Sequence, residues 1–424
     1  MLAFLFIVVY LALVLLRPQE YPQWVDSGIP FLPIALALAS LAWLVSRRKR
    51  FDAPQYLLLT LFLLTTCVSL MLTGWMGGAM DQFTVFAPTL LAFVLLANAI
   101  DSSRRSVLVM TVFVVSALVL ALHGVEQAAQ GVGWTGMPLV DDGRIQYVGI
   151  FSDPNDLGML FVICMPMAIL LSSRGGLFGL RRLFWLGACL LLLYGVYLTN
   201  SRGALLAVVA MTGVYVWQRR GPVTAGILGV GSLLVLQLMP SRLQELDVSE
   251  ASAMGRVDAW YEGMQMFISN PFFGVGTGRF TDYHHLTAHN SIILVLAENG
   301  FIGFTIWFTF VGYCFWMMLR ILRHSPTLAD AAAQTAWRRD RAIALTLLIS
   351  LSGFFASAFF LSRSYVILLY LLAALVVGHF GSVRDRFPDL AGFELRHDLL
   401  RWIALSALAT VGFYSVLKVL LALG

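Results

Sequence analysis

The sequence predicts an all-α polytopic membrane protein with about 12–13 transmembrane helices and a loop region on one face that carries short amphipathic helices. Hydrophobic residues make up 59% of the 424 residues, charged residues make up 12%, and the mean hydropathy is +0.83. Soluble domains contain roughly 45–50% apolar residues. Apolar runs of about 17–20 residues, each sufficient to cross a hydrocarbon core of about 30 Å as a helix, recur along the whole chain with short polar connections.

Thirteen segments fit this description, and we expect a single membrane domain over residues 1–424. The first has no preceding positive charge and no small-residue cleavage site, so we expect it to be retained as a span. In chain order the segments are 2–16, 29–46, 55–74, 83–100, 106–124, 156–173, 183–199, 203–218, 222–239, 300–319, 342–360, 366–380 and 402–421.

The distribution of basic residues predicts the orientation of these spans. With a cytoplasmic N-terminus, most of the 28 Lys and Arg residues fall in cytoplasmic connections such as 47–50, 104–105 and 384–401. This is the bias that membrane insertion imposes. The net charge of +5 is therefore a property of topology, and we expect no nucleic-acid partner.

Several basic residues are predicted to lie on the outer face, contrary to this bias, so their placement needs another explanation. Two outer loops, 125–155 and 240–289, are long and too polar to be simple connections. The outer basic residues are Arg17, Arg144, Arg202, Arg242, Arg256, Arg279, Arg363 and Lys418.

Arg202 lies in "TNSRGALLA", where one predicted span ends and the next begins. An arginine at that depth costs roughly 1–3 kcal/mol unless it snorkels to the interface or binds an anion. Asn200, Ser201 and Gly203 predict a tight polar turn that holds the guanidinium toward the bundle. There its planar set of donors suits phosphate, with snorkelling as the alternative.

The second outer loop contains a predicted surface helix. Residues 254–268 place apolar side chains at helical spacing, and Pro271 ends the pattern. Arg256 falls in the first turn of this helix, where the helix dipole favours an acidic residue. We therefore expect Arg256 to serve a ligand, with a lipid headgroup or solvent as the alternative.

A glycine-rich turn, "GVGTGRF", follows this helix. Gly274, Gly276 and Gly278 either form a nest of backbone amides for an anion or make a flexible turn. Arg279 comes directly after them, so Gly276 and Arg279 are both candidates for substrate binding.

His285 and His289 are four residues apart, which places two imidazoles on one helix face for a metal ion. Asp282 or His284 is the nearest third ligand, but no HExxH motif or cysteine pair accompanies them. Alternatively, His289 acts as a general base at neutral pH, because the unperturbed imidazole pKa is near 6.5. A purely structural histidine is the third interpretation.

Directly after His289, the stretch 290–299 is predicted to be a half-length amphipathic element beneath an active-site cavity, begun by Asn290. Glu298 lies in the polar break "AENG" that ends it. An acid at that depth normally has a partner, and Arg202 and Arg256 are the candidates.

The first outer loop is dense in polar residues, "DDGRIQYVGIFSDPNDLG". Asp153 or Asn155 is suited to cap the next helix, and the functional alternative is contact with a sugar or an acceptor. Asp141 and Asp142 could instead bind a divalent ion together with Asp153.

Together "FSDPNDLG", "TNSRGALLA", "GRVDAWYEGMQMFISNPFFGVGTGRF" and "HNSIILVLAENGFIGF" closely resemble the O-antigen ligase and polymerase superfamily over residues 145–310, the expected catalytic core. The resemblance implies a glycosyltransferase that needs no metal or other cofactor and lies in the bilayer of the bacterial inner membrane, with its active site facing the periplasm. The implied donor is an undecaprenyl-diphosphate-linked glycan. The acceptor is lipid A–core in a ligase of lipopolysaccharide assembly, or another lipid-linked glycan in a polymerase.

The resemblance also implies roles for individual residues. Arg202 and Arg256 hold the diphosphate, and His289 is the base on the acceptor hydroxyl. We expect further substrate-binding residues to be Ser201, Asp153, Asn155, Gly276, Arg279, Asn290 and Glu298.

We favour a ligase over a polymerase, although the second outer loop is shorter than in many ligases, which leaves a different acceptor open. A small-solute transporter is the rival from another class. Transporters place ionisable groups near the membrane midplane and often repeat one half of the chain. Here the polar residues gather at one outer surface.

Overall fold

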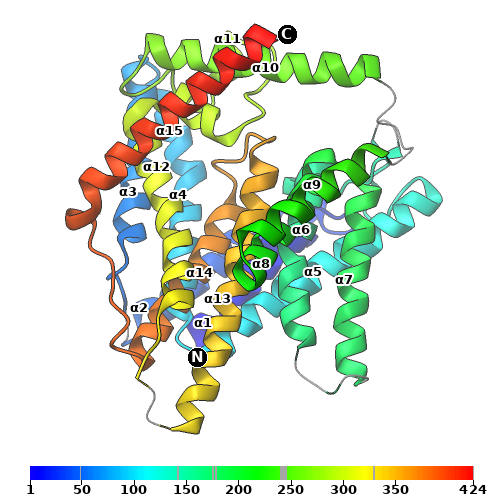
Figure 1. Cartoon of the computed structure of the whole chain (residues 1–424), viewed down its shortest axis with the longest axis vertical. Helices are drawn as coiled ribbons and strands as arrows, with labels where there is room; N and C mark the ends of the chain where they lie inside the picture. Colours follow the sequence, from blue (N-terminus) through cyan, green and yellow to red (C-terminus); the bar gives the residue numbers. More distant parts are fainter. Residues whose placement is uncertain are drawn as a thin grey trace.

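Helices form nearly all of the regular structure in the residues that the computed structural model describes, which are 1–47, 49–140, 143–173, 176, 179–238, 246–327 and 330–423 (Figure 1). In chain order they are α1 (Leu2–Leu16), α2 (Phe31–Leu44), α3 (Pro54–Leu72), α4 (Met76–Ala99), α5 (Ser103–Gln130), α6 (Pro154–Ser172), α7 (Leu180–Leu198), α8 (Arg202–Arg220), α9 (Pro222–Leu238), α10 (Leu246–Ser269), α11 (Phe280–Tyr283), α12 (Ser291–Arg323), α13 (Ala331–Ala358), α14 (Ile367–Arg386) and α15 (Leu395–Leu423). Arg242, Asp141 and Asp142, which figured in the sequence analysis, lie outside the described residues.

The predicted fold class is confirmed, because each of the thirteen predicted segments coincides with a helix. Ten helical segments among the described residues are long and apolar enough to cross a membrane: α1 extended by the 3-10 turn Pro18–Glu20 (Leu2–Glu20, 19 residues), α3, α4, α5, α6, α7, α12, α13, α14 and α15. With 14 residues, α2 is about 21 Å long, which is short of a hydrocarbon core of about 30 Å. The predicted number of crossing helices is therefore higher than the ten that meet these criteria.

The first outer loop begins later than predicted, because α5 continues to Gln130 and ends at Gly131 in a left-handed conformation (φ 81°). Polar residues near its end suggested that the span stops at 124. In the structure these residues are buried against the loop that follows. The ring of His123 lies 2.8 Å from the Thr135 hydroxyl, and Gln127 donates to the carbonyl of Met137.

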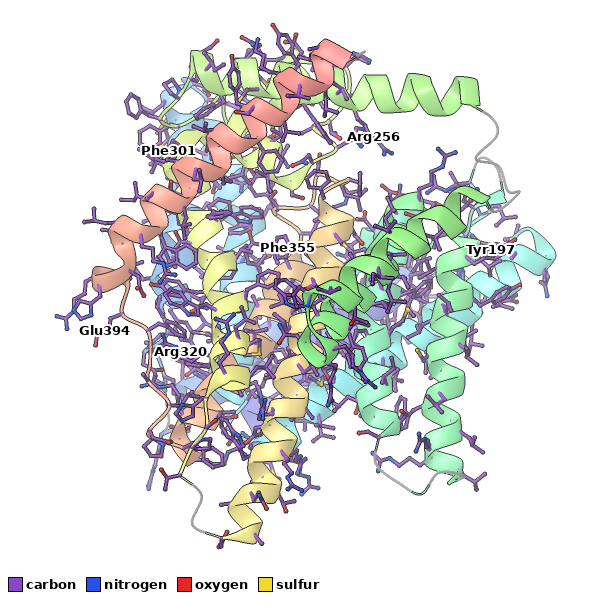
Figure 2. The ribbon with its side chains drawn as sticks, viewed as in Figure 1. Tyr197, Arg256, Phe301, Arg320, Phe355 and Glu394 are labelled. Carbon is purple, nitrogen blue, oxygen red and sulfur yellow. The ribbon has the colours of Figure 1, made fainter. Side chains whose placement is uncertain are left out.

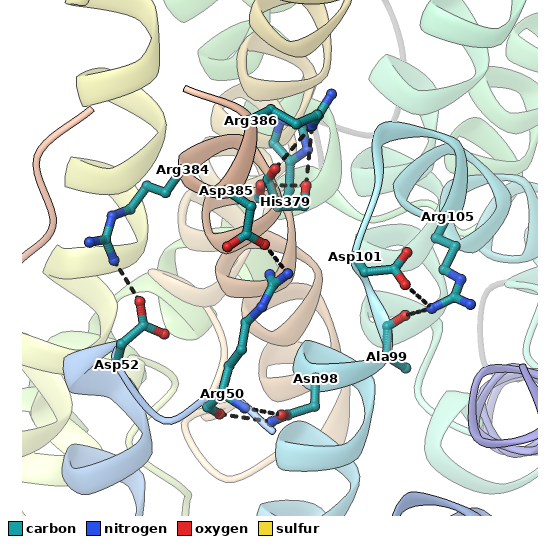
Figure 3. Close-up of polar contacts among 11 residues, drawn as sticks. Arg50, Asp52, Asn98, Ala99, Asp101, Arg105, His379, Arg384, Asp385 and Arg386 are labelled. Carbon is teal, nitrogen blue, oxygen red and sulfur yellow. Dashed lines mark hydrogen bonds and ion pairs between the residues drawn. The ribbon is translucent and has the colours of Figure 1, made fainter. Parts of the chain in front are cut away.

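Ion pairs join the arginine-rich connections at one end of the bundle (Figure 3). The pairs are Arg50–Asp385, Arg105–Asp101 (2.6 Å), Arg384–Asp52 (2.5 Å) and Arg386–Asp340 (2.8 Å). Two of them link the connection that follows α2 to the end of α14, the Arg386–Asp340 pair links α14 to α13, and the Arg105–Asp101 pair lies within the turn that begins α5. This end therefore gathers several of the basic segments that the charge distribution assigns to one side.

At the opposite end, α10 lies across the bundle, and α15 runs obliquely over the outside to meet it (Figure 1). The helix expected in the second outer loop is thus present. It begins at Leu246 rather than near 254, so Arg256 lies well inside it. The placement of Arg256 in a first helical turn is wrong, and the helix-dipole argument does not apply to it.

The long helix α12 is interrupted at Gly300, whose backbone (φ 61°, ψ −165°) is not helical. Residues 291–299 therefore form a short helix, as the polar break predicts. From Ile293 to Asn299 every residue is buried, so this short helix is not the amphipathic element that was expected. It is surrounded by protein.

The glycine-rich turn packs against this interruption. The amides of Val275 and Gly276 donate to the carbonyls of Ala297 (2.9 Å) and Glu298 (3.1 Å), and the amide of Phe301 donates to the Pro271 carbonyl (2.7 Å). Backbone groups freed by the helix break are thereby satisfied. Of the three glycine amides proposed as an anion nest, that of Gly276 is thus occupied, and that of Gly274 donates to the Asn270 carbonyl (2.9 Å). The nest interpretation is therefore wrong for Gly274 and Gly276, and the turn instead packs against the break in α12.

Replacing Gly274 by alanine is expected to lower the thermal unfolding midpoint of the detergent-solubilised protein. A Cβ at Gly274 would lie 2.3 Å from the Glu298 carbonyl carbon, at a φ of +70°. The left-handed conformation costs roughly 1–2 kcal/mol, and overpacking adds roughly 1–3 kcal/mol. Gly278→Ala is the control, because it has a φ of +75° but no atom within 4 Å of the added carbon. Equal midpoints for the two variants would contradict the packing argument.

Candidate active site

Three helices, α6, α8 and α12, begin close together at the end of the bundle opposite the ion-paired arginines, and each begins with a polar cap. The caps are Asp153, Ser201 and Asn290, which accept hydrogen bonds from the amides of Asn155 (2.9 Å), Ala204 (3.2 Å) and both Ile292 and Ile293 (2.9 and 3.1 Å). The starts of α6 and α8 touch, since a Cβ on Gly158 would lie 3.6 Å from the Ser201 Cβ. Helix N-termini favour negative charge, so this region suits an anion.

The start of α12 is joined to α6 through Arg363, which lies between α13 and α14. Arg363 Nη2 donates to Asp153 Oδ2 (2.9 Å), and Nε pairs with Asp156 Oδ1. The backbone amide of Arg363 donates to Ser291 Oγ (2.9 Å). The sequence analysis missed a role for Arg363, and the signal that could have found it was its place among the outer basic residues.

His289 sits between these helix starts with an unusual backbone conformation. It is half-buried and has a φ of 45°, which is uncommon for a residue other than glycine. Such a conformation persists only where the surroundings hold it. The next two residues are anchored, because Asn290 Nδ2 donates to the Phe359 carbonyl (3.0 Å) and Ser291 Oγ donates to the Leu361 carbonyl (2.6 Å).

The fold also brings Arg202 and Arg256 within electrostatic range of each other. Burial and the positive charge of Arg202 both lower the pKa of Arg256. Figure 2 places Arg256 on the side of α10 that faces the bundle. In the part of the chain that the structure describes, no carboxylate pairs with Arg256. Two guanidinium groups that repel each other are stabilised by an anion between them.

The same charges act on His289. Burial and the charges of Arg256 and Arg363 lower the pKa of His289, and the charge of Asp153 opposes them without reversing the shift. The imidazole is therefore neutral at pH 7, which is the form that accepts a proton. For Arg363 itself, burial lowers the pKa, but Asp156 and Asp153 outweigh burial and raise it overall.

Asn155 helps to shape the site from the first outer loop. Its side-chain oxygen accepts a hydrogen bond from Arg144 Nη2 (3.1 Å), and Arg144 Nε donates to the Thr199 carbonyl at the end of α7 (2.9 Å). Asp153, the predicted cap of α6, is confirmed in that position. The first outer loop is thus tied to the turn that carries Ser201.

Three predicted substrate-binding residues, Gly276, Arg279 and Glu298, lie at the other end of the short helix 291–299, about 12 Å along its axis from Asn290. Arg279 Nε pairs with Asp282 Oδ2 (2.8 Å). The structure does not bring these three residues into the cluster around His289.

Glu298 does not have the expected arginine partner among the described residues. Its Oε1 accepts a hydrogen bond from the Phe280 amide (3.3 Å). The expectation of a pair with Arg202 or Arg256 is therefore wrong. The reason is the burial of the short helix, which turns Glu298 toward the glycine-rich turn.

The described side chains near His284, His285 and His289 do not have the arrangement that a metal site requires. His285 is exposed, and His284 Nε2 lies 3.1 Å from Asp258 Oδ2. Within the described ranges, no group of three or more His, Cys, Asp or Glu side chains is arranged to hold a metal ion. The alternative with Asp141 and Asp142 falls outside those ranges.

A family model described as O-antigen ligase matches residues 187–308. The resemblance to the O-antigen ligase superfamily is confirmed. The matched segment runs from α7 into α12 and contains Arg202, Arg256 and His289, whereas Asp153, Asp156 and Arg363 lie outside it. The family supports glycosyl transfer of the ligase or polymerase type in a multi-pass membrane protein. No individual curated protein matches the chain.

His289 is expected to titrate below the ordinary imidazole value of about 6.5. Diethyl pyrocarbonate modifies only the neutral imidazole, so the extent of modification of the His289 peptide against pH, measured by mass spectrometry, gives its midpoint. In Arg256→Gln a neighbouring cation is lost, the protonated form becomes less unfavourable, and the midpoint moves to higher pH. A wild-type midpoint at or above 6.5, or no movement in the variant, would contradict the electrostatic description.

Proposed function

We propose that this protein transfers a glycan from undecaprenyl diphosphate to an acceptor hydroxyl at the periplasmic face of the bacterial inner membrane, as an O-antigen ligase that uses lipid A–core. The family match supports glycosyl transfer in general. The single observation that supports the finer proposal is a chain of electrostatic neighbours from separate helices and loops: Arg202 acts on Arg256, and Arg256 acts on His289.

The chemistry follows from this arrangement. The acceptor oxygen attacks the anomeric carbon, and the bond between that carbon and the diphosphate oxygen breaks. The electron pair leaves with the diphosphate, and the hydroxyl proton passes to the neutral imidazole of His289. Negative charge grows on the leaving group, where the guanidinium groups of Arg202 and Arg256 stabilise it.

In this proposal, the remaining predicted residues hold the helices and loops that form the site. Asp153, Ser201 and Asn290 cap the three helices that begin at the site, and Asn155 ties the first loop to them. Gly276, Arg279 and Glu298 surround the far end of the short helix that follows His289. In this proposal they support that helix rather than contact the donor.

The proposed reaction needs no metal ion, since the two arginines supply the positive charge that a divalent cation supplies in many phosphate-transfer sites. Arginine suits this duty because its planar donors pair with two phosphate oxygens at once. A location in the membrane suits this reaction, because the donor's polyprenyl tail remains in the bilayer while its diphosphate reaches the end of the helix bundle.

Replacing Arg202 or Arg256 by alanine is expected to lower glycan transfer by roughly 10²–10³-fold, the loss typical of removing one transition-state donor. His289→Ala should lower the transfer rate by roughly 10²–10⁴-fold with little change in donor binding. Arg219→Ala, an exposed arginine at the opposite end of α8, is the control. Transfer is measured in reconstituted membranes, with the unfolding midpoint as a check on folding. Unchanged transfer in the Arg202 and Arg256 variants would exclude the diphosphate role.

Reconstitution with an undecaprenyl-diphosphate glycan and lipid A–core is expected to give one glycan chain attached to each acceptor, with the same yield in EDTA. Product sizing on gels makes the measurement. A ladder that grows on the lipid carrier without lipid A–core would instead indicate a polymerase. Loss of transfer in EDTA, with recovery on adding zinc or magnesium, would overturn the metal-free proposal.

A further inference from the structure

The segment 359–364, between α13 and α14, lies outside the family-matched residues and beside the residues that follow His289. Four hydrogen bonds connect it to the two residues after His289. They are Asn290 Nδ2 to Phe359 O (3.0 Å), Ser291 Oγ to Leu361 O (2.6 Å), Arg363 N to Ser291 Oγ (2.9 Å) and Ser364 Oγ to Ser291 O (2.7 Å). The backbone at His289 is therefore held from one side by this segment.

The same segment also touches the helices that carry the two arginines. The ring of Phe359 packs edge-on against Trp260, which lies one turn after Arg256 on α10, at a centroid distance of 5.6 Å. Phe360 approaches α8, since a Cβ on Gly203 would lie 3.6 Å from the Phe360 Cβ. One short segment thus contacts α8, α10 and α12 next to each proposed catalytic residue.

Arg363 fixes this segment to a fourth helix, α6. Its side chain is only 22% exposed and joins two carboxylates, Asp153 and Asp156, through Nη2 and Nε. A guanidinium group suits such a two-partner bond because its donors are planar and rigid. Without Arg363, the hydrogen bonds to Asn290 and Ser291 would remain, but the segment would lose its attachment to α6.

We propose that Arg363 is a positioning residue for the transfer reaction. By binding both Asp153 and Asp156, it fixes segment 359–364 so that this segment holds His289 in its left-handed backbone conformation near Arg256. This inference rests on the proposed function, because it concerns how the base is held. It extends the site beyond the family-matched residues to a loop more than 70 positions further along the chain.

The position of His289 and the charges around it affect different measurements. The charged groups that face His289 are Arg256 from α10, Arg363 from segment 359–364 and Asp153 from α6. Losing Arg363 removes one cation and leaves Asp153 unpaired, and both changes favour protonation of the imidazole. Well above the titration midpoint every imidazole is neutral, so the plateau rate at high pH reports the position of His289 alone.

The experiment compares Arg363→Gln, Asp156→Asn and the control Arg384→Gln, which breaks the Arg384–Asp52 ion pair at the other end of the bundle. Each is assayed for kcat on the high-pH plateau, for KM of the lipid-linked donor, and for the modification midpoint of His289 by diethyl pyrocarbonate. Arg363→Gln is expected to lower the plateau kcat by roughly 10–100-fold, the effect of misplacing a reacting group, and to raise the midpoint. Asp156→Asn keeps the cation but weakens its bond to Arg363, so kcat should fall without a rise of the midpoint. Arg384→Gln should change neither the plateau kcat nor the modification midpoint of His289.

Wild-type plateau kcat in both Arg363→Gln and Asp156→Asn would overturn the inference. An equal loss of kcat in Asp156→Asn and in Arg384→Gln would also overturn the inference. The loss would then be a general effect of breaking an ion pair and not an effect of the bond between Arg363 and Asp156. If Arg363→Gln does not fold, Arg363→Lys replaces it, because lysine keeps the charge but not the planar two-partner geometry, and the same fall in plateau kcat is expected.

The modification midpoint keeps the two hypotheses apart. If His289→Ala retains transfer, the proposed base is wrong, whereas the midpoint of His289 in Arg363→Gln still reports whether Arg363 lies beside the imidazole. If His289→Ala abolishes transfer while Arg363→Gln is unaffected in both rate and midpoint, only the positioning role fails.

Discussion

Repulsion between like charges is the constraint on which the site depends. Arg202 and Arg256 come from different helices, yet the charge of Arg202 lowers the pKa of Arg256, and Arg256 lies near the half-buried imidazole of His289. Holding cations together in a partly buried place costs free energy, which the rest of the fold must supply through packing and caps. In the proposed reaction, the same arrangement stabilises the departing diphosphate.

The two ends of the bundle use arginine in different ways. At one end, arginines pair with carboxylates of neighbouring connections, and the charges are neutralised within the protein (Figure 3). At the other end, Arg363 joins two carboxylates, whereas Arg256 has no carboxylate partner among the described residues. Ion pairs of the first kind hold helices together. Arg256, which has no such partner among the described residues, leaves a positive potential that suits an anion.

The broken helix α12 provides rigid support behind His289. Gly300 ends the short helix 291–299, and the glycine-rich turn satisfies the backbone groups that the break releases. Burial of this short helix means that its position is set by packing on every side. His289, directly before it, is therefore attached to a part of the protein with little freedom to move, and segment 359–364 restrains it from the other side.

Composition, apolar length and local caps could be interpreted from the sequence alone, because they depend on neighbouring residues. The all-α membrane fold, the break near Gly300, the cap at Asp153 and the selection of Arg202, Arg256 and His289 were all predicted in this way. Contacts between distant residues were decided only by the tertiary structure. Arg363 meets Asp156 across 207 positions of sequence, and Glu298 faces Phe280 rather than an arginine. No local pattern encodes such partners, since they are set by how the helices pack.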